Sequence, residues 1–133
     1  MGEVVIRGYL AADEEAFFAM LEAEGEDWRE YSGTAGRASY ARAMATSLAY
    51  VLLVDGALCG YVRCRDDDGF GVYVYDLLVR GPHRGRQLGR ALMERVCADA
   101  AGQTVYVMSD VDPYYETLGY ERVGSVFVVT PGA

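Results

Sequence analysis

The chain has 133 residues, a formal net charge of −8 at pH 7 and a hydrophobic content of 52%. This length suits one core, so we expect a single domain over residues 1–133. No apolar run approaches the roughly 20 residues of a membrane helix, which excludes a membrane-spanning protein and predicts no membrane partner. Acidic residues interrupt the N-terminal segment where a secretory signal would continue, and we therefore expect a cytoplasmic protein.

The distribution of charge excludes some ligands and favours others. A sequence pI near 4.5 weighs against nucleic-acid binding, which requires many phosphate contacts. All 12 basic residues are arginines, and five of them lie within residues 80–95, whereas acidic residues gather in residues 13–30. One local basic patch in an acidic chain favours a small anionic ligand.

The cysteines and the histidine predict neither a disulfide nor a metal site. There are three cysteines, an odd number without a CxxC pair, and the single His83 does not complete a zinc site with them. We expect no bound metal, and we expect reduced core thiols at Cys59, Cys64 and Cys97.

The first half of the chain predicts a strand followed by two helices. Residues 4–9, VVIRGY, are short and β-branched, which is typical of a strand. Asp13 can cap a helix that carries an apolar stripe and ends at Gly25. Residues 26–36 predict a loop or broken helix, and a second helix is expected over about residues 39–47.

The pattern then becomes extended. Two strands flank Asp55-Gly56, a strong hairpin signal, and the acidic turn at residues 66–69 leads into a third strand, FGVYVYDLLV. Apolar residues recur at about 3.6 positions from Arg86 to about Ala101, which predicts a long helix.

The last part of the chain predicts strand, helix, strand. The strands are TVYVMS, residues 104–109, and GSVFVVT, residues 124–130. Between them, Asp112 as N-cap and the following proline begin a short helix that Gly119 closes. The whole order of elements predicts a mixed α/β domain.

The stretch RGRQLGR, residues 84–90, lies between the third strand and the long helix. A glycine-rich turn at a helix start exposes unpaired backbone N–H groups at the positive end of the helix dipole, which makes an anion site. The chain has no lysine, which excludes the P-loop, and glycines at 81, 85 and 89 do not fit the dinucleotide GxGxxG pattern.

Two motifs resemble those of the GNAT superfamily of acyl-CoA-dependent N-acetyltransferases. LLVRGPHRGRQLGRALM, residues 77–93, resembles motif A, whose loop reads Arg/Gln-x-x-Gly-x-Gly/Ala after a strand ending in Val. YYETLGY, residues 114–120, is similar to motif B. The order of elements is also similar, so the resemblance implies a GNAT-like α/β (α+β) fold: a mixed, mainly antiparallel central sheet with helices on both faces. Gln87 departs from the pattern, because it stands where motif A usually has its first glycine.

The resemblance implies acetyl-CoA as acyl donor. The CoA pyrophosphate would bind the backbone amides of Arg84, Gly85, Arg86, Gln87, Leu88 and Gly89. The candidate phosphate partners among side chains are Arg80, Arg86 and Arg90. Leu78 and Val79 match the positions where the family's strand diverges from its neighbour and pairs with the pantetheine arm.

The resemblance also implies direct attack by an amine in a ternary complex, without an acyl-enzyme. A backbone N–H of Leu78 or Val79 would stabilise the oxyanion. Tyr115 matches the motif B tyrosine and would be the general acid, with Tyr114 as the competing choice. Asp76 is the first candidate for the base. Further candidates are Glu26, Asp27, Asp110 and Asp112, and an ordered water could replace them all.

The expected function is transfer of an acetyl group to a primary amine on a small molecule or peptide. The acidic segment 13–30, with Trp28 and Tyr31, would favour a cationic acceptor, although the same acids also fit a solvated helix face. The alternative is a non-catalytic GNAT-like module that binds acyl-CoA or a partner protein. The sequence leaves open whether the chain forms a homodimer.

Overall fold

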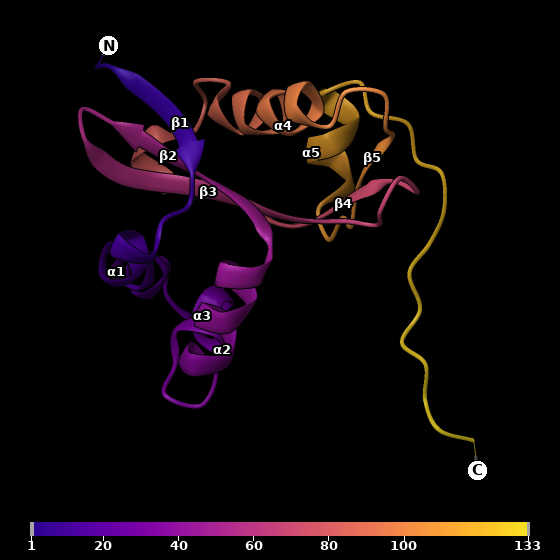
Figure 1. Ribbon diagram of the computed structural model, residues 1–133, viewed down its shortest axis with the longest axis horizontal. Coiled ribbons are helices and arrows are strands. Elements are labelled where there is room, and N and C mark those ends of the chain that lie inside the picture. The colour runs from indigo at the N-terminus through magenta and orange to yellow at the C-terminus, as the bar shows by residue number, and fades with distance from the viewer. Residues whose placement is uncertain (1, 133) are drawn as a thin grey trace.

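A five-stranded sheet forms the middle layer of the computed structural model, which describes residues 2–132 (Figure 1). The strands are β1 Val4–Gly8, β2 Leu48–Val54, β3 Ala57–Asp66, β4 Val72–Val79 and β5 Val105–Val107. They lie side by side in chain order. β1 to β4 pair antiparallel and β5 pairs parallel with β4, which confirms the expected mixed, mainly antiparallel sheet.

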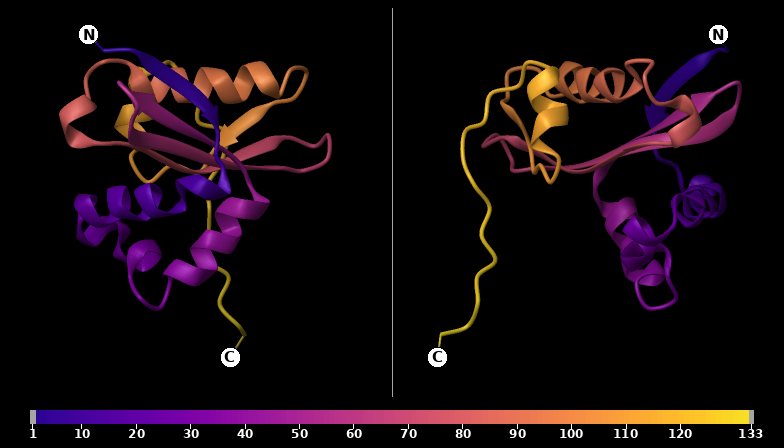
Figure 2. Two further views of the ribbon diagram at one scale, coloured as in Figure 1. Left: turned by 60° about the vertical axis from the view of Figure 1, so that its left-hand side comes forward. Right: turned by 180° about the vertical axis from the view of Figure 1, so that it is seen from behind.

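Helices cover both faces of this sheet, as expected. They are α1 Glu14–Glu24, α2 Arg29–Ser32, α3 Arg37–Thr46, α4 Leu88–Asp99 and α5 Asp112–Thr117. α1, α2 and α3 lie on one side of the sheet, and α4 and α5 lie on the other (Figures 1 and 2). Among the residues described, no helix combines the length and the apolar character needed to cross a bilayer.

Each face of the sheet has its own apolar core. Leu92 and Val96 of α4 pack on one face, against strand residues that include Val74. Phe17 and Phe18 of α1 pack on the other face, where the predicted apolar stripe of this helix is buried as expected. Burial of apolar surface on both sides stabilises the three-layer arrangement.

A β-bulge in β4 changes which side chains face which core. Arg63 pairs with Asp76, but the next residue of β3 pairs with Val74, so Tyr75 is an extra residue in β4. Before the bulge, Val74 packs in the α4 core; after it, Leu78 packs in the core under α1 and α3. An undisturbed strand would place both on one face, because side chains alternate with period two.

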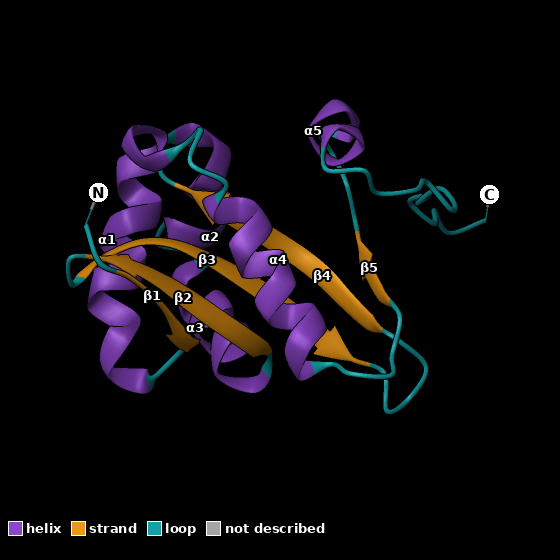
Figure 3. Ribbon diagram, turned by 90° about the horizontal axis from the view of Figure 1, so that it is seen from above, coloured by secondary structure: helices purple, strands orange, loops and turns teal. Residues whose placement is uncertain are grey.

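The pairing of β4 with β5 ends at Val74, directly before the bulge. β5 pairs only with the first three residues of β4, and a hydrogen bond of 3.0 Å from the Met108 N–H to the Val74 carbonyl ends the contact. Figure 3 shows the two strands diverging from this point. The outer edge of β4 from Asp76 to Val79 is therefore open.

The last predicted strand is wrong. Residues 120–132 form no helix or strand, and they extend away from the sheet (Figure 1). Phe127 is 83% exposed and Val128 is 90% exposed. A β-prone apolar segment becomes a strand only where a neighbouring edge lets it pack, and no described strand pairs with this one.

Several local expectations also need correction. α4 begins at Leu88 rather than at Arg86, and Asp112 is the first residue of α5 while Val111 is its N-cap. Cys97 is exposed, unlike the buried Cys59 and Cys64, so only two of the thiols lie in the core. The predicted hairpin at Asp55-Gly56 and the broken helix at residues 26–36 are confirmed.

Asp13 acts differently from the expected helix cap. It occupies the N-cap position of α1, but its side chain makes no cap hydrogen bond. Its carboxylate instead accepts two hydrogen bonds from the Arg7 guanidinium, at 2.8 and 3.0 Å, and one from the Leu10 N–H at 2.8 Å. The ion pair thereby connects β1 to the start of the first helix.

We expect Asp13→Asn to lower the free energy of unfolding by about 1–2 kcal/mol at pH 7, because it removes these charge-assisted bonds. The hydrogen bond from Arg7 lowers the pKa of Asp13. Such a carboxyl stabilises the fold above its unfolded pKa, and the contribution is lost as pH falls through its folded pKa. Urea denaturation should therefore show the difference shrinking below about pH 4.

Glu14→Gln is the matched control, because Glu14 is an exposed carboxylate in the same turn. Its effect should stay within about 0.5 kcal/mol. An Asp13→Asn effect that is the same at pH 7 and pH 3 would contradict the assignment.

Candidate active site

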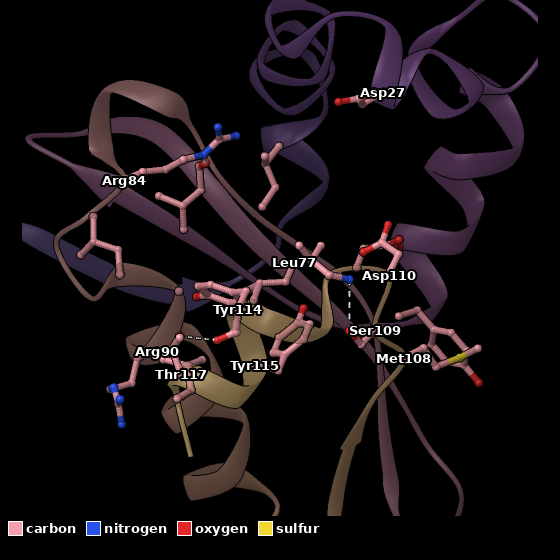
Figure 4. Close-up of a pocket in the computed structure, with 18 of the residues that line it drawn as sticks. Asp27, Leu77, Arg84, Arg90, Met108, Ser109, Asp110, Tyr114, Tyr115 and Thr117 are labelled. Atoms are coloured by element: carbon pink, nitrogen blue, oxygen red, sulfur yellow. Dashed lines mark hydrogen bonds between the residues drawn. The ribbon is translucent and has the colours of Figure 1, made fainter. Parts of the chain in front are cut away.

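A cleft of about 1170 Å³ opens where β4 and β5 diverge (Figure 4). Its walls come from the open edge of β4, the loop that follows it, the first turn of α4, α5, and the segment around Trp28. Among the residues predicted for the site, Arg80, Arg86, Glu26 and Asp112 do not line it. The predicted residues that do include Asp76, Leu78, Val79, Arg84, Gly85, Gln87, Leu88, Gly89, Arg90 and Tyr115.

One end of the cleft is built from backbone N–H groups at the start of α4. Gly85 and Gln87 both have left-handed backbone, with φ of 83° and 62°, and α4 has no side-chain cap. The first amides of a helix have no intrahelical acceptor, so this turn leaves donors directed at the cleft. The arrangement suits an anion such as a diphosphate.

Gln87 is strained by this backbone conformation. A left-handed φ is unfavourable for a residue with a side chain and natural for glycine, which gives a physical reason for the glycine usual at this point of the motif. Gln87 is the N-cap of α4, whereas the sequence predicted helix already from Arg86. Its side chain accepts a hydrogen bond of 3.1 Å from the Nε of Arg90.

The arginines near this end fall into two groups. The Arg84 Nη2 lies 2.8 Å from the Glu24 carboxylate, and the Arg80 Nε lies 3.5 Å from it. The Arg84 Nε also donates to the Val79 carbonyl at 2.8 Å. Within residues 2–132, no ion pair involves Arg86 or Arg90.

Two tyrosines of α5 project into the cleft (Figure 4). A Cβ at position 89 would meet the Tyr114 hydroxyl, so Gly89 is needed for this tyrosine to lie over the start of α4. Tyr115 is half-buried. Burial, followed by the charges of neighbouring groups, raises the pKa of Tyr115 to about 12. Its phenol therefore keeps its proton throughout the neutral range.

The other end of the cleft is aromatic and acidic. Trp28, Tyr31 and Tyr75 line it together with Asp27, Asp76 and Asp110. The rings of Trp28 and Tyr31 lie 5.9 Å apart at a tilt of 49°. Such a mixture of rings and carboxylates suits a cationic group.

The candidate bases separate into two sets. Asp76, Asp27 and Asp110 line the cleft, whereas Glu26 and Asp112 do not. Glu26 pairs with Arg29 at 3.4 Å, and the Asp112 carboxylate accepts a hydrogen bond of 2.7 Å from the Ser109 hydroxyl.

Sequence reasoning missed part of the lining. Met108, Ser109 and Val111 enter the cleft because the chain turns from β5 into α5 there, and Tyr75 enters through the bulge. The break between strand 104–109 and the helix start at Asp112 was a usable signal for the first three. Nothing in the alternating pattern around Tyr75 marks a bulge.

A mixed sheet whose strands diverge beside a glycine-containing turn and a helix start defines a class of acyl-CoA-dependent transferases. The model of the Acetyltransferase (GNAT) family matches residues 11–120. The chain belongs to this family, and it is an acyltransferase.

Two plant proteins resemble part of the chain. A Glycine max protein named Histone acetyltransferase TAP1 is 32% identical over 69 residues, which is 48% of this chain and 30% of that protein. GCN5-related N-acetyltransferase 2, chloroplastic, of Arabidopsis thaliana is 30% identical over 69 residues, 48% of this chain and 27% of that protein. The match thus spans less than a third of these relatives.

Solved structures share the fold over nearly the whole chain. Aminoglycoside acetyltransferase HMB0005, from an uncultured soil metagenomic sample, has a TM-score of 0.76 at 20% identity, covering 98% of this chain and 99% of that one. Aminoglycoside N-acetyltransferase AAC(6')-Iy in complex with CoA has a TM-score of 0.73 at 12% identity, with coverages of 100% and 97%. The family uses acetyl-CoA as its donor.

We expect Gln87→Gly to raise the free energy of unfolding by up to about 1 kcal/mol, because it relieves the left-handed strain. Gly85→Ala is the matched control that should introduce the same strain. The φ of Gly85 is also left-handed, and an added Cβ would contact no other atom. This second variant should lose about 1 kcal/mol. Chemical denaturation measures the free energy of unfolding of both variants. A lower value in Gln87→Gly than in the wild type would contradict the assignment of backbone strain to Gln87.

Proposed function

We propose that this protein transfers an acetyl group from acetyl-CoA to a primary amine by direct attack in a ternary complex. The observation that carries the proposal is that one cleft joins the open β4 edge, the first turn of α4 and the Tyr115 phenol. We propose that residues 1–133 act as one acetyltransferase domain, and that it works in the cytoplasm, where free thiols persist.

The start of α4 would hold the donor's diphosphate. Amides from Gly85 to Gly89 supply hydrogen-bond donors. Arg90 lines the cleft and supplies positive charge, as would the nearby Arg86, and within residues 2–132 neither makes an ion pair. Arg84 and Arg80 contribute less charge to a ligand, because Glu24 pairs with both. The amide linkages of the pantetheine arm could pair with the open edge of β4 as an added strand would.

The alternation of the β4 backbone supports Val79 as the oxyanion donor. The Arg80 N–H bonds the Cys59 carbonyl on the β3 side, while the Val79 carbonyl accepts from Arg84 on the open side. Successive residues of a strand direct their N–H groups to opposite edges. Val79, like Leu77, therefore directs its N–H to the open edge, and this favours Val79 over Leu78.

Tyr115 would protonate the departing thiolate. A phenol with a raised pKa holds its proton at neutral pH and can still donate it to a thiolate formed in the transition state. Tyr114 is the weaker candidate, because its hydroxyl lies over Gly89 at the donor end.

The acceptor would be a cationic amine, bound between the aromatic rings and carboxylates at the far end of the cleft. The carboxylates of Asp27, Asp76 and Asp110 attract the ammonium, and Asp76 would take its proton directly or through a water. This class of small-molecule or peptide amines agrees with the acceptors named for similar proteins. Those proteins are a histone acetyltransferase, an aminoglycoside acetyltransferase and a ribosomal-protein-alanine acetyltransferase.

A calorimetric titration with acetyl-CoA, followed by thiol release across a panel of amines, tests the function. We expect binding and amine-dependent release, with di- and polycationic acceptors preferred over neutral ones. Absence of acetyl-CoA binding would overturn the proposal. Binding without any amine-dependent release would instead favour the non-catalytic module.

Two neighbouring variants test the acid. Tyr115→Phe should lower kcat about 100-fold and leave the acetyl-CoA dissociation constant within about twofold, because general acid catalysis contributes about 10²–10⁴ in rate. Tyr114→Phe should affect kcat far less, since its hydroxyl lies at the donor end. A larger loss of kcat in Tyr114→Phe than in Tyr115→Phe would show that Tyr114, and not Tyr115, is the general acid.

A further inference from the structure

A hydrogen-bonded network beneath the acceptor end holds Asp76. Its Oδ2 accepts a bond of 2.5 Å from the Tyr40 hydroxyl and one of 2.6 Å from the Arg63 Nε. The side chains of Arg63 and Asp76 are only 13% and 8% exposed. The Tyr40 hydroxyl is also 2.7 Å from the Tyr61 hydroxyl. Since Tyr40 gives its one proton to Asp76, Tyr61 donates to Tyr40.

The two oxygens of Asp76 therefore differ. Oδ2 is fully occupied by two strong donors, whereas Oδ1 accepts no hydrogen bond from the residues that the structure describes. Asp76 nevertheless lines the cleft. A carboxylate tied through one oxygen presents the other in a fixed direction, as an amine-binding group requires.

We propose that Tyr40 is a positioning residue for Asp76: its hydroxyl, together with Arg63, holds the Asp76 carboxylate oriented toward the acceptor amine. This inference rests on the proposed function for its acceptor. It extends that function by assigning a role to buried residues on α3 and β3 that line no part of the cleft.

Titratable groups from three elements surround Asp76. β3 contributes Arg63 and Tyr61, α3 contributes Tyr40, and α2 contributes Tyr31. Burial is the largest cause that raises the pKa of Tyr31, Tyr40 and Tyr61, so all three phenols stay protonated at neutral pH. Asp27 and Asp110 share the cleft with Asp76, and Arg63 is in direct contact with it.

Tyr40→Phe and Tyr61→Phe form a matched pair. Each removes one buried hydroxyl, but only Tyr40 bonds Asp76 directly. A hydrogen bond donated to a carboxylate favours its ionised form. Tyr40→Phe should therefore move the acid limb of kcat/KM upward by about one pH unit, and Tyr61→Phe should move it much less.

A second measurement is independent of turnover. Carbon-13 NMR of the aspartate carboxyls, with Asp76→Asn assigning the signal of residue 76, gives the pH midpoint of its titration in each protein. A higher midpoint in Tyr40→Phe alone supports the network. An unchanged midpoint, or an equal change in Tyr61→Phe, overturns it, as does an acid limb that stays in place in an active Tyr40→Phe enzyme. If no amine is acetylated by the wild type, the proposed function fails while the NMR titration still decides the network.

Discussion

The extra residue in β4 is the constraint on which the site depends. Without the bulge at Tyr75, the two-residue period of the strand would turn Asp76 to the same face as Val74, against the apolar core under α4. The bulge turns Asp76 to the opposite face, where Tyr40 and Arg63 meet it. The pairing between β4 and β5 also ends at the bulge. The cleft therefore opens beside the same inserted residue that turns Asp76, the most buried carboxylate of the cleft, toward it.

The cleft separates opposite charges along its length. Backbone amides, Arg84 and Arg90 line one end, and three carboxylates line the other, although the whole chain has a formal net charge of −8. Charges in water are screened over about 8 Å at physiological ionic strength. The negative surface of the chain therefore does little to repel an anion held at the start of α4, while carboxylates inside the cleft act on a cation at short range.

The sequence predicted those features that depend on local pattern. Periodicity located the long helix, and the Asp55-Gly56 turn marked the hairpin. Most of the residues that the two motifs implied for the site line one cleft. It could not predict features that depend on pairing in space. Apart from Asp76, the residues on both sides of the bulge at Tyr75 are apolar or aromatic, so no change of period marks it. The contact of Arg63 with Asp76 follows only from strand register. The apolar segment 124–130 had the composition of a strand but has no described partner.

One residue of the acidic segment 13–30 makes structural ion pairs that the composition alone does not predict. Glu24 ends α1, in the helical layer that also contributes Trp28 to the acceptor end, yet its carboxylate is only 13% exposed and pairs with Arg84 and Arg80 at the donor end. Leaving such a carboxylate without its partners would be costly, so the pairs hold the loop after β4 against the helical layer. A loop held before any ligand arrives loses less conformational entropy on binding. One carboxylate thus joins the loop after β4, at the donor end, to the helical layer that contributes Trp28 to the acceptor end.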